Sequence, residues 1–284
     1  MNGSDLMFAD LHCHTKISDG TIGISEIMSI AKKLGLAGIS ITDHDTFEGT
    51  TKAQVLGKRY GLKVIPGIEI SAIDNKRNRR VHILCYMCAH PSRLQGLLAK
   101  TAKSRKDAAT LMLQKIMQLY PISPQMVSNR AKGSTNIFKQ HIMHTLIDAG
   151  YTDKIYSNLY KKLFDPERGI AYAKVAYPDV FEVVEQIHYA GGVAVLAHPA
   201  EYDSFDLLNE LIDAKIDGVE VWHSRSTRED EKKLQEIAFN NDLIMTGGSD
   251  FHGMYNKKPV QVGSSVAPME QVNKLIERSK LYNI

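Results

Sequence analysis

Seven short runs of apolar and β-branched residues alternate with segments of helical period along this chain, and a histidine or a carboxylate lies at or near the C-terminal side of each run. The runs are residues 7–11, 37–42, 62–70, 80–86, 192–197, 217–222 and 243–247. Such alternation is typical of a parallel α/β fold. Because active sites of β/α barrels form at the C-terminal ends of the strands, the pattern predicts one polar site on a barrel or a wide sheet.

Segments of helical period separate most of these runs. The predicted helices cover residues 25–34, 47–60, 206–214, 228–240 and 269–280. The fourth and fifth runs are separated by a much longer gap, about residues 91–177, in which residues 94–119 and 141–150 also have helical spacing. A gap of this length with helices of its own predicts an inserted subdomain, because long structureless loops are uncommon in compact domains.

The polar residues at the strand ends are of the types that bind metal ions. His12 and His14 lie two residues apart, as do Asp250 and His252, and such pairs point the same way in an extended chain. The candidates are Asp10, His12, His14, Asp19, Asp43, His44, Asp45, Glu69, His82, His198, His223, Asp250 and His252. Imidazole and carboxylate ligands favour Zn, Mn or Fe over an iron–sulfur cluster. One tetrahedral ion cannot use so many ligands, so we expect two or three ions bridged by Glu69.

Composition excludes several other classes of protein. The 284 residues are 43% hydrophobic and 24% charged, which excludes a disordered or fibrous chain. The net charge of +3 is too small to imply nucleic acid or a membrane surface by itself. No apolar run approaches the length of a membrane span, and residues 1–10 lack the features of a signal peptide. Three cysteines fit a reducing compartment, so we expect a cytoplasmic protein. No obligate protein partner is evident from the sequence.

Four motifs resemble those of the PHP (polymerase and histidinol phosphatase) family of metal-dependent phosphoesterases. They are Asp10-x-His12-x-His14 with Ser18-Asp19-Gly20, then Thr42-Asp43-His44-Asp45, then His82, and finally Ser249-Asp250-x-His252. The resemblance implies a distorted (β/α)7 barrel with an inserted helical subdomain. The predicted barrel comprises residues 1–92 and 177–284, and the predicted insertion, a lid, comprises residues 93–176.

The resemblance also implies how the metal ions are held. The first ion would be bound by His12, His14, Glu69 and Asp250, the second by Glu69, His82 and His198, and the third by Asp19, His44 and His252. Asp43 would hydrogen-bond a ligand imidazole and fix its tautomer.

The insertion resembles that of nucleotide phosphatases within the family, on the stretch from Thr135 to Tyr151. That group hydrolyses 3′,5′-bisphosphonucleotides or nucleoside monophosphates, and some members trim the 5′ ends of short RNA. It usually has Arg-Pro-His where this chain has Lys139-Gln140-His141. Lysine can hold a phosphate as a point charge but lacks the bidentate fork of arginine.

The resemblance therefore implies a phosphatase acting on a phosphorylated small molecule, with a metal-bridging hydroxide attacking phosphorus. The expected catalytic residues are Glu69, Asp43 and His223, the last as the proton donor to the leaving group or as a phosphate contact. The expected substrate-binding residues are Lys139, His141, Arg168, Ser224 and Arg225.

Four other functions compete with this one. An enzyme of the same fold could act on histidinol phosphate or another small phosphomonoester. A PHP accessory domain would bind metal without turnover, and an amidohydrolase with a related His-x-His motif would cleave C–N bonds. A dedicated nucleic-acid-binding module is disfavoured, because no stripe of basic and aromatic residues is present.

Overall fold

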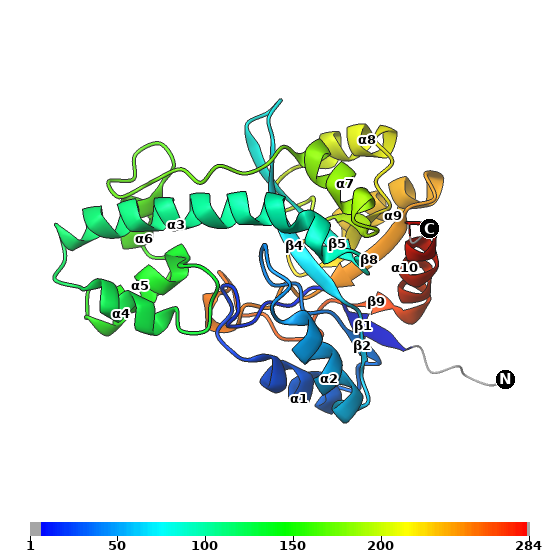
Figure 1. Ribbon diagram of the computed structural model, residues 1–284, viewed down its shortest axis with the longest axis horizontal. Helices are drawn as coiled ribbons and strands as arrows, with labels where there is room; N and C mark the ends of the chain where they lie inside the picture. Colours follow the sequence, from blue (N-terminus) through cyan, green and yellow to red (C-terminus); the bar gives the residue numbers. More distant parts are fainter. Residues whose placement is uncertain (1–6, 283–284) are drawn as a thin grey trace.

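The computed structural model describes residues 7–282. Residues 1–6 and 283–284 of the predicted barrel lie outside the described residues, as does most of the segment 1–10 that was considered as a signal peptide. Figure 1 shows two lobes: a larger one that contains the sheets and both ends of the described chain, and a smaller helical one to its side. A single long helix, α3, spans the two lobes. Within the described residues the chain forms nine strands in two sheets.

The first sheet is built mostly from the first quarter of the chain. Its strand order is β3-β2-β1-β9, with β9 antiparallel to β1 and the other pairs parallel. The strands are β1 (Phe8–Asp10), β2 (Gly38–Ile39), β3 (Lys63–Val64) and β9 (Ala267–Pro268). Helices α1 (Ile24–Lys33) and α2 (Thr50–Tyr60) connect the first three. Helix α1 turns Ile27, Met28 and Ala31 into the core, the spacing of an amphipathic helix.

The second sheet has the strand order β4-β5-β6-β7-β8. These strands are β4 (Gly67–Asp74), β5 (Arg79–Tyr86), β6 (Val193–Leu196), β7 (Gly218–His223) and β8 (Ile244–Gly248). The pairs β4–β5 and β5–β6 are antiparallel, and the pairs β6–β7 and β7–β8 are parallel. The helices that pack with this sheet or follow its strands are α7 (Val180–Tyr189), α8 (Phe205–Asp213), α9 (Arg228–Asn240) and α10 (Met269–Tyr282).

The α/β fold is confirmed, but the expected strands and their parallel pairing differ from the structure in three places. The predicted strand over residues 62–70 is two strands, because Pro66 has no N–H to continue a ladder, and β3 and β4 join different sheets. The polar turn after Asp74 makes β4 and β5 a hairpin, and hairpins are antiparallel. Strand β9 is two residues long and was not predicted.

Backbone contacts between the two sheets complete a distorted barrel. Leu11 N donates to Gly247 O at 3.1 Å, which joins β1 to the second sheet. On the other side, Asp45 N donates to Glu69 O at 2.9 Å, next to an isolated parallel bridge between His44 and Glu69. Both junctions pass through residues of the predicted metal motifs. The irregular closure therefore brings these motifs together.

Alternation along β5 separates the barrel interior from its outer layer. Val81, Ile83 and Cys85 belong to the core that packs against α7, α8 and α9. Leu84 belongs instead to the inner cluster with Val195, and His82 lies on the same side of the strand as Leu84. The sequence pattern of β5 thus turns one imidazole into the barrel.

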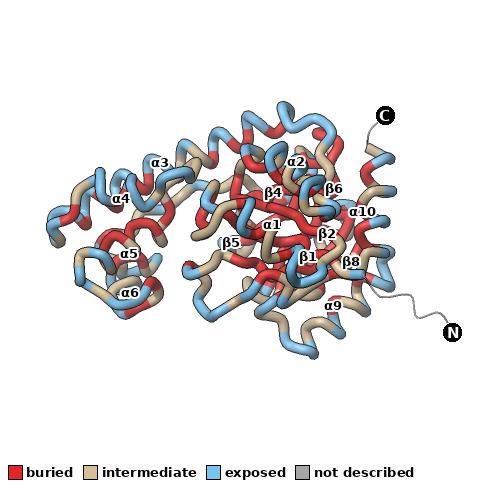
Figure 2. Tube along the Cα trace, turned by 90° about the horizontal axis from the view of Figure 1, so that it is seen from below, coloured by how far each residue is buried: buried red, intermediate tan, exposed pale blue. Residues whose placement is uncertain are grey.

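The smaller lobe has a core of its own. It is formed by part of α3 (Gln95–Met117), by α4 (Pro124–Arg130), α5 (Lys139–Asp148) and α6 (Asn158–Phe164), around Ile116, Ile142 and Leu163. Figure 2 shows buried segments on the inner sides of these helices and in the middle of the larger lobe. The first turns of α3 pack on the barrel through Leu97 and Leu98. One helix therefore ties both cores together.

The predicted limits of the insertion, residues 93 and 176, stay a prediction. Among residues 7–282, no helix combines the length and the apolar character that crossing a membrane requires.

Candidate metal centre

Glu69 is the point on which the buried imidazoles of the barrel converge. Its Oε2 lies 3.4 Å from His12 Nε2, 3.1 Å from His14 Nε2 and 3.2 Å from His44 Nδ1. Its Oε1 lies 2.7 Å from His82 Nδ1 and 2.8 Å from His198 Nε2. The carboxylate is 1% exposed. One carboxylate thus lies against five imidazoles from four separate segments, which suits the bridging position predicted for it.

Three groups of side chains around Glu69 have ligand atoms close enough to share one ion. The groups are His12, His14, Glu69 and Asp250; His14, Asp19, His44 and His252; and His44, Glu69 and His82. The structure therefore brings together all nine residues predicted as metal ligands, with His198 attached through Glu69. The division of these nine among three ions stays a prediction.

Two observations indicate that this cluster fits cations. His12 Nε2 and His14 Nε2 lie 3.1 Å apart and face the oxygens of Glu69 and Asp250. His12 Nδ1 donates to Glu220 Oε1 at 3.0 Å, so in the neutral ring Nε2 presents a lone pair to the cluster. Asp19 Oδ1 and His44 Nδ1 are buried without a hydrogen-bond partner among the described residues. Converging lone pairs without donors are what a divalent ion satisfies.

The pKa values of the cluster residues are consistent with a site in which metal ions replace protons. Burial alone would raise the pKa of Glu69, but the imidazoles of His82, His44 and His12 hold it well below its usual range. Burial alone would lower the pKa of His14, but hydrogen bonds with Asp250 and Glu69 raise it to about 10. Without ions His14 therefore keeps a proton that ion binding must displace, whereas burial lowers the pKa of His44 and His82, so that these two rings are neutral.

His82 differs from the other imidazoles. Arg80 Nε donates to His82 Nε2 at 3.1 Å, and a guanidinium has no lone pair to accept with. In the neutral ring the proton is therefore on Nδ1, which donates to Glu69 Oε1. In this arrangement His82 orients the carboxylate. It can offer Nδ1 to an ion only after that proton leaves.

Backbone geometry at the strand ends is unusual. His198, Asp250 and Asp45 have φ values of 29°, 53° and 56°, in the left-handed region that residues other than glycine rarely adopt. Such strain persists only where the surroundings over-determine it. Gly248 permits the close approach of β8 to β1, because a Cβ there would collide with His12. The chain thus accepts local strain to place these side chains.

A layer of hydrogen bonds behind the cluster differs in one respect from the prediction. Asp43 was expected to bond a ligand imidazole directly. Its Oδ1 instead accepts from Thr15 N at 2.7 Å and from Ser18 Oγ at 2.6 Å, and Ser18 Oγ lies 3.5 Å from His14 Nδ1. Asp43 therefore acts on His14 through Ser18, because the loop after β1 folds between them.

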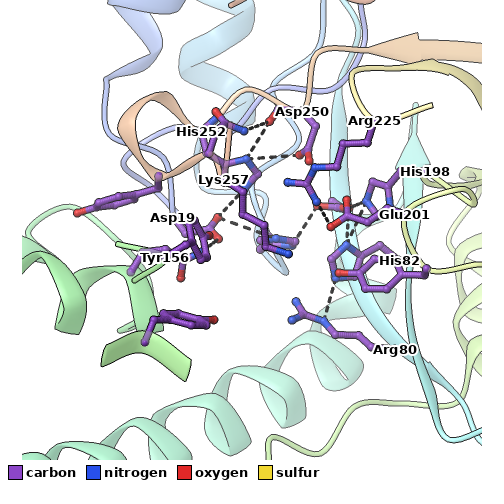
Figure 3. Close-up of a pocket in the computed structure, with 17 residues that line it drawn as sticks. Asp19, Arg80, His82, Tyr156, His198, Glu201, Arg225, Asp250, His252 and Lys257 are labelled. Atoms are coloured by element: carbon purple, nitrogen blue, oxygen red, sulfur yellow. Dashed lines mark hydrogen bonds and ion pairs between the residues drawn. The ribbon is translucent and has the colours of Figure 1, made fainter. Parts of the chain in front are cut away.

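A cavity of about 150 Å³ opens above the cluster. Figure 3 shows its labelled side chains directed toward one space, with Tyr156 from the insertion across from His198 and Arg225 of the barrel. Arg80, Arg225 and Lys257 line it together with the cluster. A buried set of carboxylates and imidazoles beneath three cations can hold metal ions and an anion together.

Comparison with known proteins identifies this arrangement. The model of the PHP domain matches residues 10–189, which is more than half of the chain. The chain belongs to the PHP domain family. The predicted family and the predicted class of enzyme, a metal-dependent phosphoesterase, are thereby confirmed.

Three curated PHP relatives are similar over most of their length. A phosphoribosyl 1,2-cyclic phosphate 1,2-diphosphodiesterase of Eggerthella lenta is 34% identical over 89% of this chain and 97% of its own. A 5′-3′ exoribonuclease of Haemophilus influenzae is 28% identical over 86% and 89% of the two chains. A 3′,5′-nucleoside bisphosphate phosphatase of Chromobacterium violaceum is 27% identical over 86% of each.

The PHP fold is also found in solved structures that cover nearly the whole chain. A protein of Bifidobacterium adolescentis, assigned as a metal-dependent phosphoesterase, superposes with a TM-score of 0.86 at 31% identity, over 95% of this chain and 96% of its own. The insertion is therefore included in the match.

The residues predicted to bind substrate are dispersed in this PHP protein. Arg225 lines the cavity above the metal cluster and pairs with Glu201. Lys139 lines a neighbouring cavity. Within residues 7–282, His141, Arg168 and Ser224 line neither cavity. His141 is buried and accepts from Phe138 N at the start of α5, and Arg168 is exposed. These three positions therefore do not support the expected contacts.

Several residues of the PHP site were missed by the sequence reading. Glu220, on β7, is buried; its Oε1 accepts from His12 and its Oε2 accepts from His198 N at 2.9 Å. The cavity residues Arg80, Tyr156 and Lys257 were also missed. Glu220 could have been found, because it is a carboxylate in an otherwise apolar strand, three residues before His223. The other three have no motif and meet only in the folded chain.

Proposed function

We propose that this protein hydrolyses phosphate esters of ribose units, with a phosphomonoester of a nucleotide as the preferred substrate. The observation that carries the proposal is the cluster around Glu69 lying at the base of a cavity whose rim contains Arg80, Arg225 and Lys257. All three curated relatives act, by their names, on compounds that contain a phosphorylated ribose unit. A nucleoside 3′,5′-bisphosphate, a nucleoside monophosphate and the 5′ end of a short RNA share this unit.

Two or three divalent ions of Mn, Fe or Zn fit the nine predicted ligands. Bound there, such ions would offset the charge of a phosphoryl group and lower the pKa of water. Glu69 would hold them together, since both of its oxygens face imidazoles. Asp43 would keep His14 oriented through Ser18.

His223 is the residue that we assign to proton transfer. Its Nδ1 accepts the N–H of Arg225 at 3.3 Å, so in the neutral ring the proton is on Nε2. Nε2 is buried, has no hydrogen-bond partner among the described residues and lies 3.5 Å from Asp250 Oδ2. His223 lines neither cavity, whereas Asp250 does, so this proton would reach a leaving oxygen by way of the Asp250 carboxylate. Arg225 and Lys257 would orient the phosphate, and Tyr156 would limit the access of water.

One further candidate substrate has a specific observation in its favour. The relative with 34% identity acts, by its name, on a phosphoribosyl 1,2-cyclic phosphate, a diester. The same cluster could hold a cyclic phosphate of ribose.

The three cysteines are free, which supports the proposed cytoplasmic location.

The test is chromatographic analysis of products, with inorganic phosphate measured alongside, for protein loaded with Mn²⁺, Fe²⁺ or Zn²⁺ in turn, because cleavage of a diester yields a monoester and no inorganic phosphate. Adenosine 3′,5′-bisphosphate, AMP, a 5′-phosphorylated RNA dinucleotide, phosphoribosyl 1,2-cyclic phosphate and histidinol phosphate are compared side by side. We expect the ribose esters to have the higher kcat/KM. Preference for histidinol phosphate would overturn the substrate assignment. Ion binding without cleavage of any of these esters would indicate an accessory domain.

A further inference from the structure

The insertion contacts the loop that contains Asp19. Thr135 N donates to Ile17 O at 2.9 Å, and the Thr135 hydroxyl donates to the same oxygen at 3.2 Å. Gln140, in the first turn of α5, donates from Nε2 to Asp19 Oδ2 at 3.2 Å. The other oxygen of Asp19 lies 3.3 Å from His252 Nε2. Asp19 thus presents one carboxylate oxygen to the insertion and the other to the metal cluster.

The loop after β8 reaches into the insertion. Tyr255, three residues after His252, is 4% exposed and packs in the core of the insertion. Its hydroxyl is hydrogen-bonded to Nδ1 of His144, on α5, at 2.8 Å. His252 N donates to Asn256 Oδ1 at 2.7 Å, which braces the segment between them. The position of His252 therefore depends on where α5 lies.

A third metal ligand also meets the insertion. The ring of His44 faces the ring of Phe138, with 6.1 Å between their centres and 27° between their planes. Phe138 is buried and directly precedes α5. One of the three groups that could hold an ion therefore has three of its four members backed by the insertion, directly or through Tyr255. This group is His14, Asp19, His44 and His252.

The other ligands are supported from within the barrel. Glu220, on β7, accepts from His12, and Arg80, on β5, donates to His82. Asp250 precedes His252 in the same loop, but its N donates to the carbonyl oxygen of His12 at 2.9 Å, which ties it to the end of β1. The insertion has a core of its own. Units with separate cores move relative to each other unless a large apolar interface joins them.

We propose that the insertion controls one ion of the metal centre. The ion held by His14, Asp19, His44 and His252 binds tightly only when the insertion is docked on the barrel, whereas the other ions bind without this requirement. The set of ions is therefore complete only in the docked arrangement. By linkage, an ion that prefers the docked arrangement also favours docking by the same factor. This inference rests on the proposed function only in that the centre holds metal ions, and it requires no particular substrate.

The first test measures binding of Mn²⁺ to the full chain stripped of metal, by calorimetry and by elemental analysis after dialysis. Tyr255→Phe and His144→Leu each remove the hydrogen bond between α5 and the loop. We expect the affinity for one ion to fall about threefold to tenfold, the cost of one neutral hydrogen bond. The affinities for the other ions should stay within about twofold. His144→Asn, which keeps a polar group near the position of Nδ1, should restore most of the loss. The matched control is Tyr151→Phe, exposed on the insertion.

A larger effect on the same ion is expected for Gln140→Leu. Asp19 loses the donor that orients it, so the affinity for this ion should fall about 10- to 100-fold. Gln114→Leu, exposed on α3, is the control. Equal losses for every ion, no loss for any, or binding of only two ions to the wild-type protein at millimolar Mn²⁺ would overturn the inference.

Amide hydrogen exchange tests the reciprocal effect. Residues 134–145 of the wild-type protein should exchange more slowly with Mn²⁺ bound than without it, and Asp19→Asn should lose most of this slowing. Exchange in α9, which lies on the barrel, should be the same in both proteins at each Mn²⁺ concentration. Slowing that persists in Asp19→Asn, or that is absent from the wild-type protein, would contradict the coupling.

Neither measurement depends on turnover, so this inference and the proposed function can fail separately. If Tyr255→Phe and Gln140→Leu weaken one ion but the wild-type protein cleaves no phosphate ester, the proposed function fails and the inference stands. If esters are cleaved but both variants bind every ion as the wild-type protein does, the inference fails alone.

Discussion

The two sides of the metal cluster are supported in different ways. His12 and His82 have their partners, Glu220 and Arg80, on strands of the barrel. The ligands around Asp19 meet the insertion instead, which packs beside the barrel with a core of its own.

The difference teaches which part of the cluster the barrel fixes by itself and which part depends on the insertion. A buried cluster with strained backbone at His198 and Asp250 tolerates little change in residue type. Two units with separate cores can shift relative to each other, since the contacts between such units resemble transient interfaces. We therefore expect substitutions on the barrel side to affect the whole centre and its activity, and substitutions at the contacts with the insertion to affect one ion.

The largest effect is expected for Glu69→Gln. The substitution removes one of the charges that hold the ions together and leaves the imidazoles of His12, His14 and His82 facing an amide. We expect kcat to fall by more than 10²-fold, beyond the loss of 10- to 100-fold typical for an outer partner of a ligand. Phosphate release and bound metal, measured by elemental analysis, test this, with His90→Ala at an exposed position as the control. Full metal content with full activity would contradict the role of Glu69.

A smaller effect is expected for Glu220→Gln. The amide can accept one of the two N–H groups now bound to the carboxylate, from His12 and His198, but would turn a donor toward the other. Metal affinity should fall about 10- to 100-fold. Titration with a competing chelator measures it. Glu236→Gln, at an exposed position on α9, should leave affinity unchanged. Equal affinities for the two variants would show that Glu220 is not a positioning residue.

Arg80 belongs to the barrel side and lines the cavity above the cluster, so Arg80→Met tests whether its charge also contacts the phosphate that is cleaved. Loss of its positive charge should raise KM about tenfold for every phosphate ester, including ribose 5-phosphate. The matched control is Arg59→Met on α2, where the side chain is exposed. A rise in KM limited to adenosine 3′,5′-bisphosphate would contradict a contact between Arg80 and the phosphate that is cleaved.

The smallest effect is a dependence of KM on pH. Because the pKa of Lys139 is lowered to about 8, this side chain is charged below that pH and neutral above it. The sequence predicts that Lys139 contacts phosphate, so the affinity for adenosine 3′,5′-bisphosphate should decrease as the pH rises through 8, with its KM rising about threefold to tenfold. Lys139→Arg should be flat over this interval, since arginine stays charged. A rise of the same size in both proteins would assign the titration to another group.

Sequence reasoning reached most of the metal cluster, because its ligands are marked by type and by short spacing. His12 and His14 are two residues apart in extended chain, and Asp250 and His252 repeat that spacing. The sequence pattern also predicted that a strand ends at Glu69, and this was wrong. Glu69 is the third residue of β4, and its direction is set by the break at Pro66 and by pairing across two sheets.

Substrate contacts were predicted less well, for a physical reason. His141 lies on α5 and Arg168 in the turn after α6, and the sequence does not reveal which of their neighbours meet the barrel; neither residue lines either cavity. Arg80 and Lys257 are separated by more than half of the chain, and no local pattern links them.

The sequence by itself determined the alternation of strands and helices, the helical insertion, the residue types of the metal cluster and the family. These depend on periodicity and on side-chain chemistry, which are local properties. Tertiary structure alone decided the antiparallel hairpin within the barrel, the convergence of five imidazoles on Glu69, the support from Glu220 and the contacts of the insertion with the loop that contains Asp19. Each of these depends on where distant segments meet when the barrel closes and the insertion packs beside it, and burial of the two cores joined by α3 determines that arrangement.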